Sequence, residues 1–180
     1  RVKGRAFWYD YESDLQSWID VNDLTSLRFT SDSDENGRDR LKRFEIFPDR
    51  GVYVEETLKG SETVEQPSVK DPLDEGSFLY FVRTVPLEVG QTYTFERYFR
   101  PDRNPVTIKV LKKERIKVPA GTFDAIVIQP IIKTKGIFSE GGKAQIWLKD
   151  DPSRIMLQMK STLSIGSINL YLKSYRPGTP

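Results

Sequence analysis

The last third of the chain, from Val106 to Tyr175, has the pattern of five consecutive β-strands joined by short turns. Between Val106 and Val118, apolar residues recur at even positions and basic residues recur at odd positions. The segment from Phe123 to Ile132 is apolar at both parities, which indicates a strand that is buried on both faces. This spacing is typical of an antiparallel meander, so the sequence predicts a mainly β fold.

The first two thirds of the chain predict further strands and one helix. The segment SDSDENGRD between two strand-like runs predicts a β-hairpin. Phe78, Leu79, Phe81 and Val82 have helix-compatible spacing after the start signal Asp71-Pro72. The expected elements are strands over Val2–Tyr11, Ser26–Thr30, Leu41–Phe47, Val52–Leu58 and Thr92–Arg100, a polar loop over Lys59–Asp71, and a helix over Leu73–Thr84.

Length and charge limit the organisation of the chain and its partners. A chain of 180 residues can close one core, so we expect a single domain over residues 1–180 with residues 175–180 as a frayed tail. The 28 basic and 26 acidic residues give a formal net charge of +2, which does not favour nucleic acid or an anionic membrane as the main partner. We expect no membrane span, because no stretch approaches the roughly 18 apolar residues that a spanning helix requires.

The sequence contains neither cysteine nor histidine, and this removes several classes of chemistry. Without cysteine there is no disulfide, no thiolate nucleophile and no cysteine-ligated metal. Without histidine there is no imidazole base, no Ser-His-Asp triad and no histidine pH switch. We therefore expect a protein that is not an enzyme and that uses no cofactor and no metal.

Two segments partly match known ligand-binding loops. Asp32, Asp34, Asn36 and Gly37 reproduce the first half of an EF-hand calcium loop, but the twelfth position is Arg43 instead of a carboxylate. We interpret this segment as a hairpin turn with Asn36-Gly37 at its corner. The segment Gly136–Ala144, GIFSEGGKA, resembles a phosphate-binding loop but precedes a predicted strand where such a loop requires a helix, so we interpret it as a hairpin turn.

Carboxylate pairs raise the alternative of an enzyme that acts on glycans, since a glycosidase uses two acids about 5 to 10 Å apart. Glu55 and Glu56 are neighbours on a predicted strand and therefore point to opposite faces. Asp150 and Asp151 precede Pro152 in a predicted turn. A carboxylate enzyme stays open as the least favoured of three functions.

Two sets of side chains are candidate binding residues. One set is mainly aromatic and can line an apolar cavity beneath the helix, although the same residues can fill an ordinary core. The other set forms a basic face on one predicted strand that can dock phosphates, acidic lipid or a protein partner, although a solvated face is the simpler interpretation. The apolar set is Phe78, Phe81, Tyr93, Phe95, Arg97, Phe99 and Trp147, and the basic set is Lys109, Lys113, Arg115 and Lys117.

Arg97 is unusual because its parity places it on the same predicted face as Tyr93, Phe95 and Phe99. An unpaired buried guanidinium is costly. We therefore expect Arg97 to bind an acidic partner such as Glu114, or to lie at the mouth of a cavity.

Three segments resemble a known family. They are the turn V-P-A-G-T-F-D at Val118–Asp124, the turn I-W-L-K-D-D at Ile146–Asp151 and the closing strand Gly166–Leu172. In these segments, and in SFLYFVRTVPL with Arg83, the chain resembles the bacterial exported family known as domain of unknown function 3108. The likeness is strong over the second half of the chain and weak over the first. That family has no established catalytic residues to transfer to this sequence.

The resemblance implies a periplasmic or cell-envelope protein whose signal peptide has been removed. It also implies a curved antiparallel sheet or half-open β-barrel meander with one short helix on its concave side, a shape similar to the periplasmic lipoprotein carriers. We therefore expect a non-enzymatic binding module for an apolar or lipid ligand. The alternative is a structural or interaction subunit that docks onto a larger envelope assembly through its sheet edges.

Overall fold

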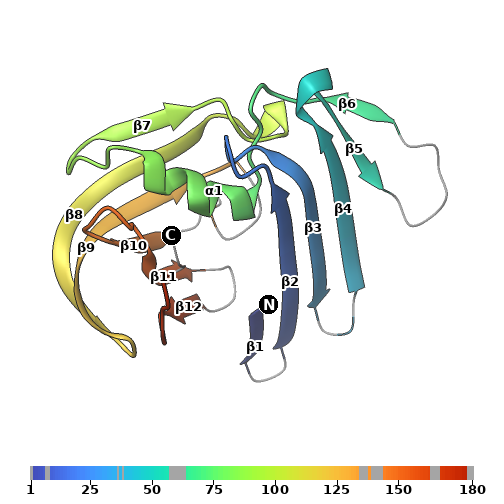
Figure 1. The fold of residues 1–180 in the computed structure, drawn as a ribbon. Helices are drawn as coiled ribbons and strands as arrows, with labels where there is room; N and C mark the ends of the chain where they lie inside the picture. The colour runs from blue at the N-terminus through green and yellow to red at the C-terminus, as the bar shows by residue number, and fades with distance from the viewer. Residues whose placement is uncertain are drawn as a thin grey trace. The chain divides into compact units, whose positions relative to one another are not determined.

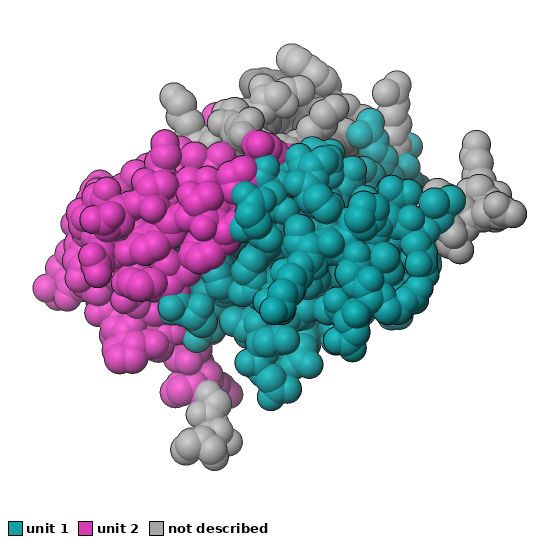
Figure 2. Space-filling view, turned by 90° about the horizontal axis from the view of Figure 1, so that it is seen from above, with its two compact units in different colours: residues 1–84, 96–104 teal, residues 85–95, 105–180 magenta. Residues whose placement is uncertain are grey.

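The computed structural model of the chain describes residues 2–6, 9–35, 37, 39–56, 64–133, 138, 144–162 and 167–177. Its chain divides into two compact units, which Figure 2 shows in different colours. The N-terminal unit comprises residues 1–84 and 96–104, and the C-terminal unit comprises residues 85–95 and 105–180. Each unit is built around one antiparallel sheet of six strands (Figure 1).

The sheet of the N-terminal unit follows the order of the chain, with each strand paired to the next. The predicted hairpin is confirmed, and its strands β3 and β4 extend further toward the turn than the alternation indicated. The predicted first strand is two strands, and the predicted polar loop contains β6, which pairs with β5. The strands are β1 (Val2–Ala6), β2 (Tyr9–Ile19), β3 (Ser26–Glu35), β4 (Asp39–Phe47), β5 (Val52–Glu56) and β6 (Glu65–Pro67).

An aromatic cluster forms the core of this unit. Phe44 lies on β4 and contacts Phe29 on β3, with the ring centroids 6.2 Å apart. The Phe99 ring packs against Phe44 at 5.1 Å and against Tyr53 at 5.2 Å. Each of these four side chains is less than 9% exposed, so together they form a buried hydrophobic cluster.

The predicted helix is present but begins later and ends earlier than expected. Helix α1 spans Glu75–Phe81, and a 3-10 turn follows over Val82–Thr84. Leu73 forms a parallel bridge with Tyr98 and is not helical. The helix starts after Asp74, because that side chain caps the first turn and provides a stronger start signal than Asp71-Pro72.

The sheet of the C-terminal unit contains the five strands predicted between Val106 and Tyr175, preceded by one short strand. The predicted strand Thr92–Arg100 ends at Phe95, and the residues after it belong to the N-terminal unit. As predicted, β9 is buried on both faces at Ala125–Ile128. The strands are β7 (Thr92–Phe95), β8 (Val106–Val118), β9 (Gly121–Ile131), β10 (Gln145–Lys149), β11 (Met156–Thr162) and β12 (Ser167–Tyr171).

A β-bulge divides the long strand β8 into two halves. Val110 pairs with Ile128 and Lys112 pairs with Val127, so Leu111 has no directly opposite residue on β9. The bulge reverses the parity of the strand, because two residues of β8 oppose one of β9. Val106, Ile108 and Val110 therefore face one side of the sheet, whereas Ile116 and Val118 face the other.

The chain therefore has a mainly β fold with antiparallel sheets and one short helix, as the sequence predicted. Among the described strands, the two sheets are open: β1 and β6 lie at the edges of one, and β7 and β12 at the edges of the other. Within the described residues, no helix has the length and apolar character to cross a membrane. The expectation of a single domain stays a prediction, and of the predicted tail only residues 175–177 are described, as exposed chain without regular structure.

Candidate functional site

The start of α1 carries a buried carboxylate that organises its surroundings. The Asp74 side chain accepts hydrogen bonds from the backbone amides of Gly76 at 2.6 Å and Ser77 at 3.0 Å. It also accepts one from the hydroxyl of Ser17 on β2 at 2.7 Å and a further short one from the hydroxyl of Ser26 on β3. Asp74 therefore fixes the first turn of α1 to two neighbouring strands.

Burial raises the pKa of Asp74 above its usual range, while the hydrogen bonds from Ser26, Ser77 and Ser17 act in the opposite direction. The Ser77 hydroxyl accepts a hydrogen bond of 2.8 Å from the Asp74 backbone amide and so completes a capping box. The Asp74 carboxyl group is buried and bound by the surrounding chain, so its role is to hold the start of α1 in place.

Glu75, the next residue, is a second acid and is partly buried. Its Oε1 accepts a hydrogen bond of 2.9 Å from the Tyr98 hydroxyl, and its Oε2 is buried without a hydrogen-bond partner among the described residues. Burial, followed by the charge of Asp74, raises the pKa of Glu75 to about 7. Burial and the neighbouring Glu75 raise the pKa of the Tyr98 hydroxyl well above its usual value. The pair can therefore hold a proton at neutral pH.

The backbone of Tyr98 is fixed independently of its hydroxyl. The Asn104 side chain accepts a hydrogen bond from the Tyr98 amide at 2.8 Å and donates one to the Tyr98 carbonyl at 3.0 Å. Beside it, the Phe99 amide donates a backbone hydrogen bond to the Leu73 carbonyl, and the Leu73 amide donates one to the Arg97 carbonyl. Sequence reasoning missed Glu75 and Tyr98, since the two residues are 23 positions apart and no sequence pattern links them.

The predicted apolar residues of the N-terminal unit lie in its interior. Phe78 and Phe99 are each 1% exposed, and Phe81 is 8% exposed. Phe99 belongs to the packed aromatic cluster described above. These contacts are those of a hydrophobic core, and the lining of a ligand cavity by these three residues stays a prediction.

Arg97 has different partners from the expected one. Its guanidinium lies over the Phe81 ring, 4.7 Å from the centroid, and its Nε donates a 2.7 Å hydrogen bond to the Asp71 carbonyl. Burial lowers the pKa of Arg97, whereas Asp71 and Asp23 oppose this shift. The expected partner Glu114 instead binds residues of the C-terminal sheet.

The prediction that one strand face carries Tyr93, Phe95, Arg97 and Phe99 is wrong. Strand β7 ends at Phe95, so the alternation does not continue to Arg97 and Phe99, which belong to the N-terminal unit. Tyr93 and Phe95 are partly exposed and lie opposite Ile108 and Val106 on β8.

One face of the C-terminal sheet carries an unbroken row of aliphatic side chains. Val110, Ile128, Ile146, Met159 and Leu170 are directly opposite one another across five neighbouring strands. Residues that are directly opposite in antiparallel strands share a face. We call this side of the sheet, at the level of the row, the aliphatic face; its further apolar members are Ile108, Ile126 and Leu148. Lys113, Arg115 and Lys117 lie on the same side, closer to the β8–β9 turn.

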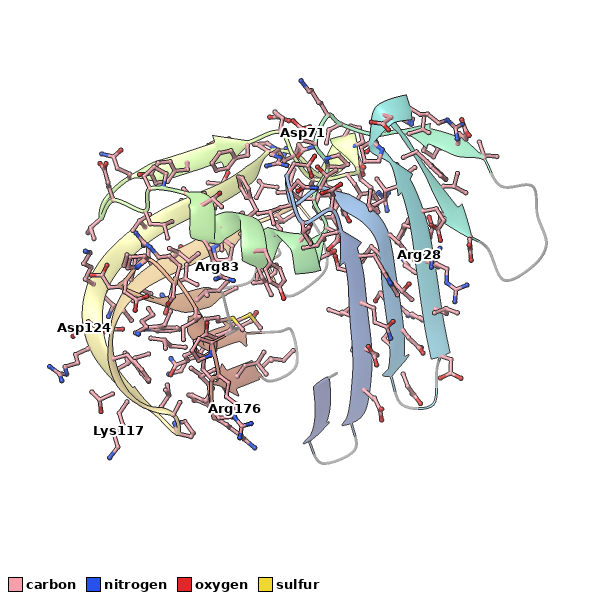
Figure 3. The ribbon with its side chains drawn as sticks, in the orientation of Figure 1. Arg28, Asp71, Arg83, Lys117, Asp124 and Arg176 are labelled. Atoms are coloured by element: carbon pink, nitrogen blue, oxygen red, sulfur yellow. The ribbon has the colours of Figure 1, made fainter. Side chains whose placement is uncertain are left out.

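The four predicted basic residues are exposed but do not form one face. Lys109 lies opposite Gln129, whereas Lys113, Arg115 and Lys117 lie opposite Ile126, Asp124 and Thr122. Because the bulge between them reverses the parity, Lys109 is on the other side of the sheet from the remaining three. Lys113 forms an ion pair of 2.8 Å with Asp150. Lys117 lies near the β8–β9 turn (Figure 3).

The side of the sheet opposite the aliphatic face holds a cluster of charged and aromatic groups. The Trp147 indole N–H donates a 2.7 Å hydrogen bond to Glu114, which also binds the Lys112 ammonium at 2.7 Å. These two hydrogen bonds lower the pKa of Glu114, with Lys112 the larger cause. The Lys160 ammonium lies 5.6 Å from the Trp147 ring centroid. Trp147 is only 5% exposed and packs in a cluster with Ala125, Val127, Ile155 and Leu157.

The partial calcium motif is part of the β3–β4 hairpin, as predicted. Asp32 and Asp34 lie on β3, and the Asp34 carboxylate accepts a 2.6 Å hydrogen bond from the Gly37 amide. Asn36 lies outside the described residues. In the part of the chain that the structure describes, no group of three or more acidic side chains is placed to hold a metal ion.

The other near-motifs have structural partners where they are described. Asp151 binds Lys149 at 2.6 Å and caps the turn through Ser153, and these contacts lower its pKa to about 2. Glu56 forms an ion pair of 3.1 Å with Arg43. The segment Gly136–Ala144 lies outside the described residues except at Phe138 and Ala144.

No curated protein and no solved structure matches the chain. The model of one family, described as a protein of unknown function (DUF3108), matches residues 1–173. This match covers both sheets and confirms the resemblance seen in the turn and strand motifs, so the chain belongs to the DUF3108 family.

Proposed function

We propose that the chain is a non-enzymatic binding module of the bacterial cell envelope, and that it accommodates an apolar or lipid ligand against the aliphatic face of the C-terminal sheet. The observation that carries this proposal is the aliphatic row across five strands, in which no position holds a polar side chain. A ligand of hydrocarbon chains requires such a surface, because any unpaired polar group there would weaken binding.

Two further features support the proposal. Strand β7 adds Tyr93 and Phe95 on the same face, opposite Ile108 and Val106 of β8, and both residues are partly exposed. The aliphatic residues Ile128 and Ile146 at its centre are fully buried, so a ligand would enter by displacing the groups that cover them. Placement in the periplasm rests on the exported character that the sequence resemblance implies.

The test is native mass spectrometry of the protein purified from its own cell envelope, before and after organic extraction. The expected result is a complex whose excess mass is lipid-sized and disappears on extraction. The variant Ile128→Phe adds bulk to the aliphatic face and is expected to lose the ligand. Its matched control Val127→Phe adds the same ring to the opposite face of the same strand and is expected to retain it.

Circular dichroism first establishes that both variants keep their sheet structure, since an enlarged core residue can be destabilising. If Ile128→Phe does not fold, the smaller change Ile128→Val is compared with the wild type for ligand occupancy. A wild-type chain that carries no extractable mass overturns the proposal, and so does equal loss of ligand in the two phenylalanine variants.

A second function is favoured by the open edges of the sheets. Strand β12 lies at the edge of the C-terminal sheet among the described strands, and its Tyr171 is 45% exposed. An edge strand presents unpaired backbone groups that can pair with a strand of another protein. In this alternative the chain is an interaction subunit of an envelope assembly. The same mass spectrometry would then show a bound protein and no lipid.

A further inference from the structure

Charge is distributed very unevenly between the two units. The N-terminal unit contains 15 basic and 20 acidic residues, a net charge of −5, whereas the C-terminal unit contains 13 basic and 6 acidic residues, a net charge of +7. The small overall charge of +2 is therefore the sum of an acidic unit and a strongly cationic unit. A field of this sign attracts anionic surfaces.

Within the C-terminal unit, part of this charge lies on the side of the sheet opposite the aliphatic face. The strand pairs place Lys109 and Lys112 on β8, Lys149 on β10 and Lys160 on β11 on this side. Glu114 is the single acid among the strand residues that pair on the same side. We call this surface the lysine face.

The lysines differ in how far their charge is already neutralised. Lys112 is bound to Glu114, and Lys149 is bound to Asp151. Lys109 and Lys160 are exposed and have no carboxylate hydrogen-bonded to them among the described residues. No described carboxylate therefore binds either ammonium group directly, although the Lys160 ammonium also lies over the Trp147 ring.

Neutral side chains complete a surface suited to a membrane interface. The strand pairs place Thr92, Thr94, Gln129 and Asn169 on the same side of the sheet. Tyr171 is 45% exposed and lies directly opposite Gln158. Gln158 in turn lies opposite the buried Trp147. Tyrosine and lysine side chains suit the headgroup region of a bilayer, because each has an apolar part that can contact lipid and a polar end that can stay in water.

We propose that the lysine face docks the C-terminal sheet onto a bilayer surface that contains anionic phospholipid headgroups. The four lysines would approach the phosphates while the aliphatic face points away from the headgroups. This proposal concerns a different surface from the ligand site proposed above, and either can hold without the other.

The test is co-sedimentation of the intact chain with vesicles of phosphatidylcholine alone or mixed with phosphatidylglycerol, at low and high salt. We expect binding only to the vesicles that contain phosphatidylglycerol, and weaker binding as salt is added. In the double variant Lys109→Gln/Lys160→Gln, affinity for these vesicles should fall about tenfold to thirtyfold. The reason is that each lysine near an anionic surface contributes a factor of about five to the affinity.

The matched control is Arg115→Gln/Lys117→Gln, which removes the same charge from exposed positions on the other side of the sheet. We expect this variant to bind within about threefold of the wild type, with unchanged salt dependence. Circular dichroism checks the fold of each variant. If the double variant does not fold, the single variant Lys109→Gln replaces it and should lose about fivefold.

Equal losses in the two double variants would overturn the proposal, because net charge instead of the lysine face would then determine binding. Binding to phosphatidylcholine alone, or no binding to either kind of vesicle, would overturn it as well. The test is independent of the apolar ligand, since extraction of that ligand leaves the lysines in place.

Discussion

The hydroxyl of Tyr98 donates a 2.9 Å hydrogen bond to the carboxyl group of Glu75, and this bond connects the first turn of α1 to the segment that follows β7. Asp74, one position earlier, connects the same turn to β2 and β3. Two adjacent acids therefore join the helix to three separate parts of the N-terminal unit, and the second of them has a pKa of about 7.

The variant Glu75→Gln should change how stability depends on pH. Burial raises the pKa of Glu75 from 4.5 to about 7 in the folded state, so folding favours the protonated form. Its contribution is complete below pH 4.5 and is lost as the pH rises through about 7. Glutamine is uncharged throughout and keeps an oxygen that accepts from Tyr98. Above pH 7 the variant should be more stable than the wild type by up to about 3 kcal/mol.

Urea unfolding across this pH range measures the difference. The control Glu96→Gln replaces an exposed glutamate of the same unit and should leave the wild-type pH dependence unchanged. If Glu75→Gln and the wild type lost stability in parallel between pH 4.5 and 7, the buried carboxyl group would not be the titrating one.

The variant Gly76→Ala should destabilise the protein although alanine is the better helix former by about 1 kcal/mol. A Cβ atom at position 76 would lie 2.6 Å from the Cβ of Ser17, which is closer than real contacts allow. Helix α1 would have to move away from β2 and stretch the Ser17–Asp74 hydrogen bond. We expect a loss of about 2 kcal/mol in urea unfolding.

A second substitution separates this clash from other causes. The double variant Gly76→Ala/Ser17→Gly removes the obstructing atom and should be less unstable than the sum of its single variants. Strict additivity of the two losses would show that the close approach of α1 to β2 is not the cause.

The strands of the C-terminal sheet were predictable because alternation and turn residues are local signals. The aromatic face over residues 93–99 was not, since nothing local shows that β7 ends at Phe95 and that the chain then passes to the other unit. Similarly, Asp74-Glu75-Gly76-Ser77 contains a capping pattern, but the burial of Glu75 depends on Tyr98, which is distant in sequence. Long-range contacts determine these features, and they leave no periodic pattern.

The bond between Trp147 and Glu114 gives a prediction for the C-terminal sheet. The buried indole N–H donates to Glu114 at 2.7 Å, so Glu114→Ala should leave it without an acceptor and cost about 1 to 3 kcal/mol in urea unfolding. Glu114→Gln retains an acceptor oxygen and should cost less. Lys112→Ala removes only a solvent-exposed ion pair and should change stability by less than about 1 kcal/mol. A loss in Lys112→Ala equal to that in Glu114→Ala would assign the effect to the ion pair instead.

The basic face was mispredicted because alternation was counted through Leu111, which the bulge leaves without a partner on β9. A bulge adds one residue without a composition signal, and only the pairing with β9 reveals it. Deleting Leu111 should therefore reverse the second half of β8 and turn Ile116 and Val118 out of their packed layer, with a loss of about 3 kcal/mol or more. The substitution Leu111→Ala keeps the bulge at a position that is 37% exposed and should cost less than about 1 kcal/mol. Urea unfolding compares the two variants, and a deletion variant as stable as Leu111→Ala would show that the bulge does not set the faces of β8.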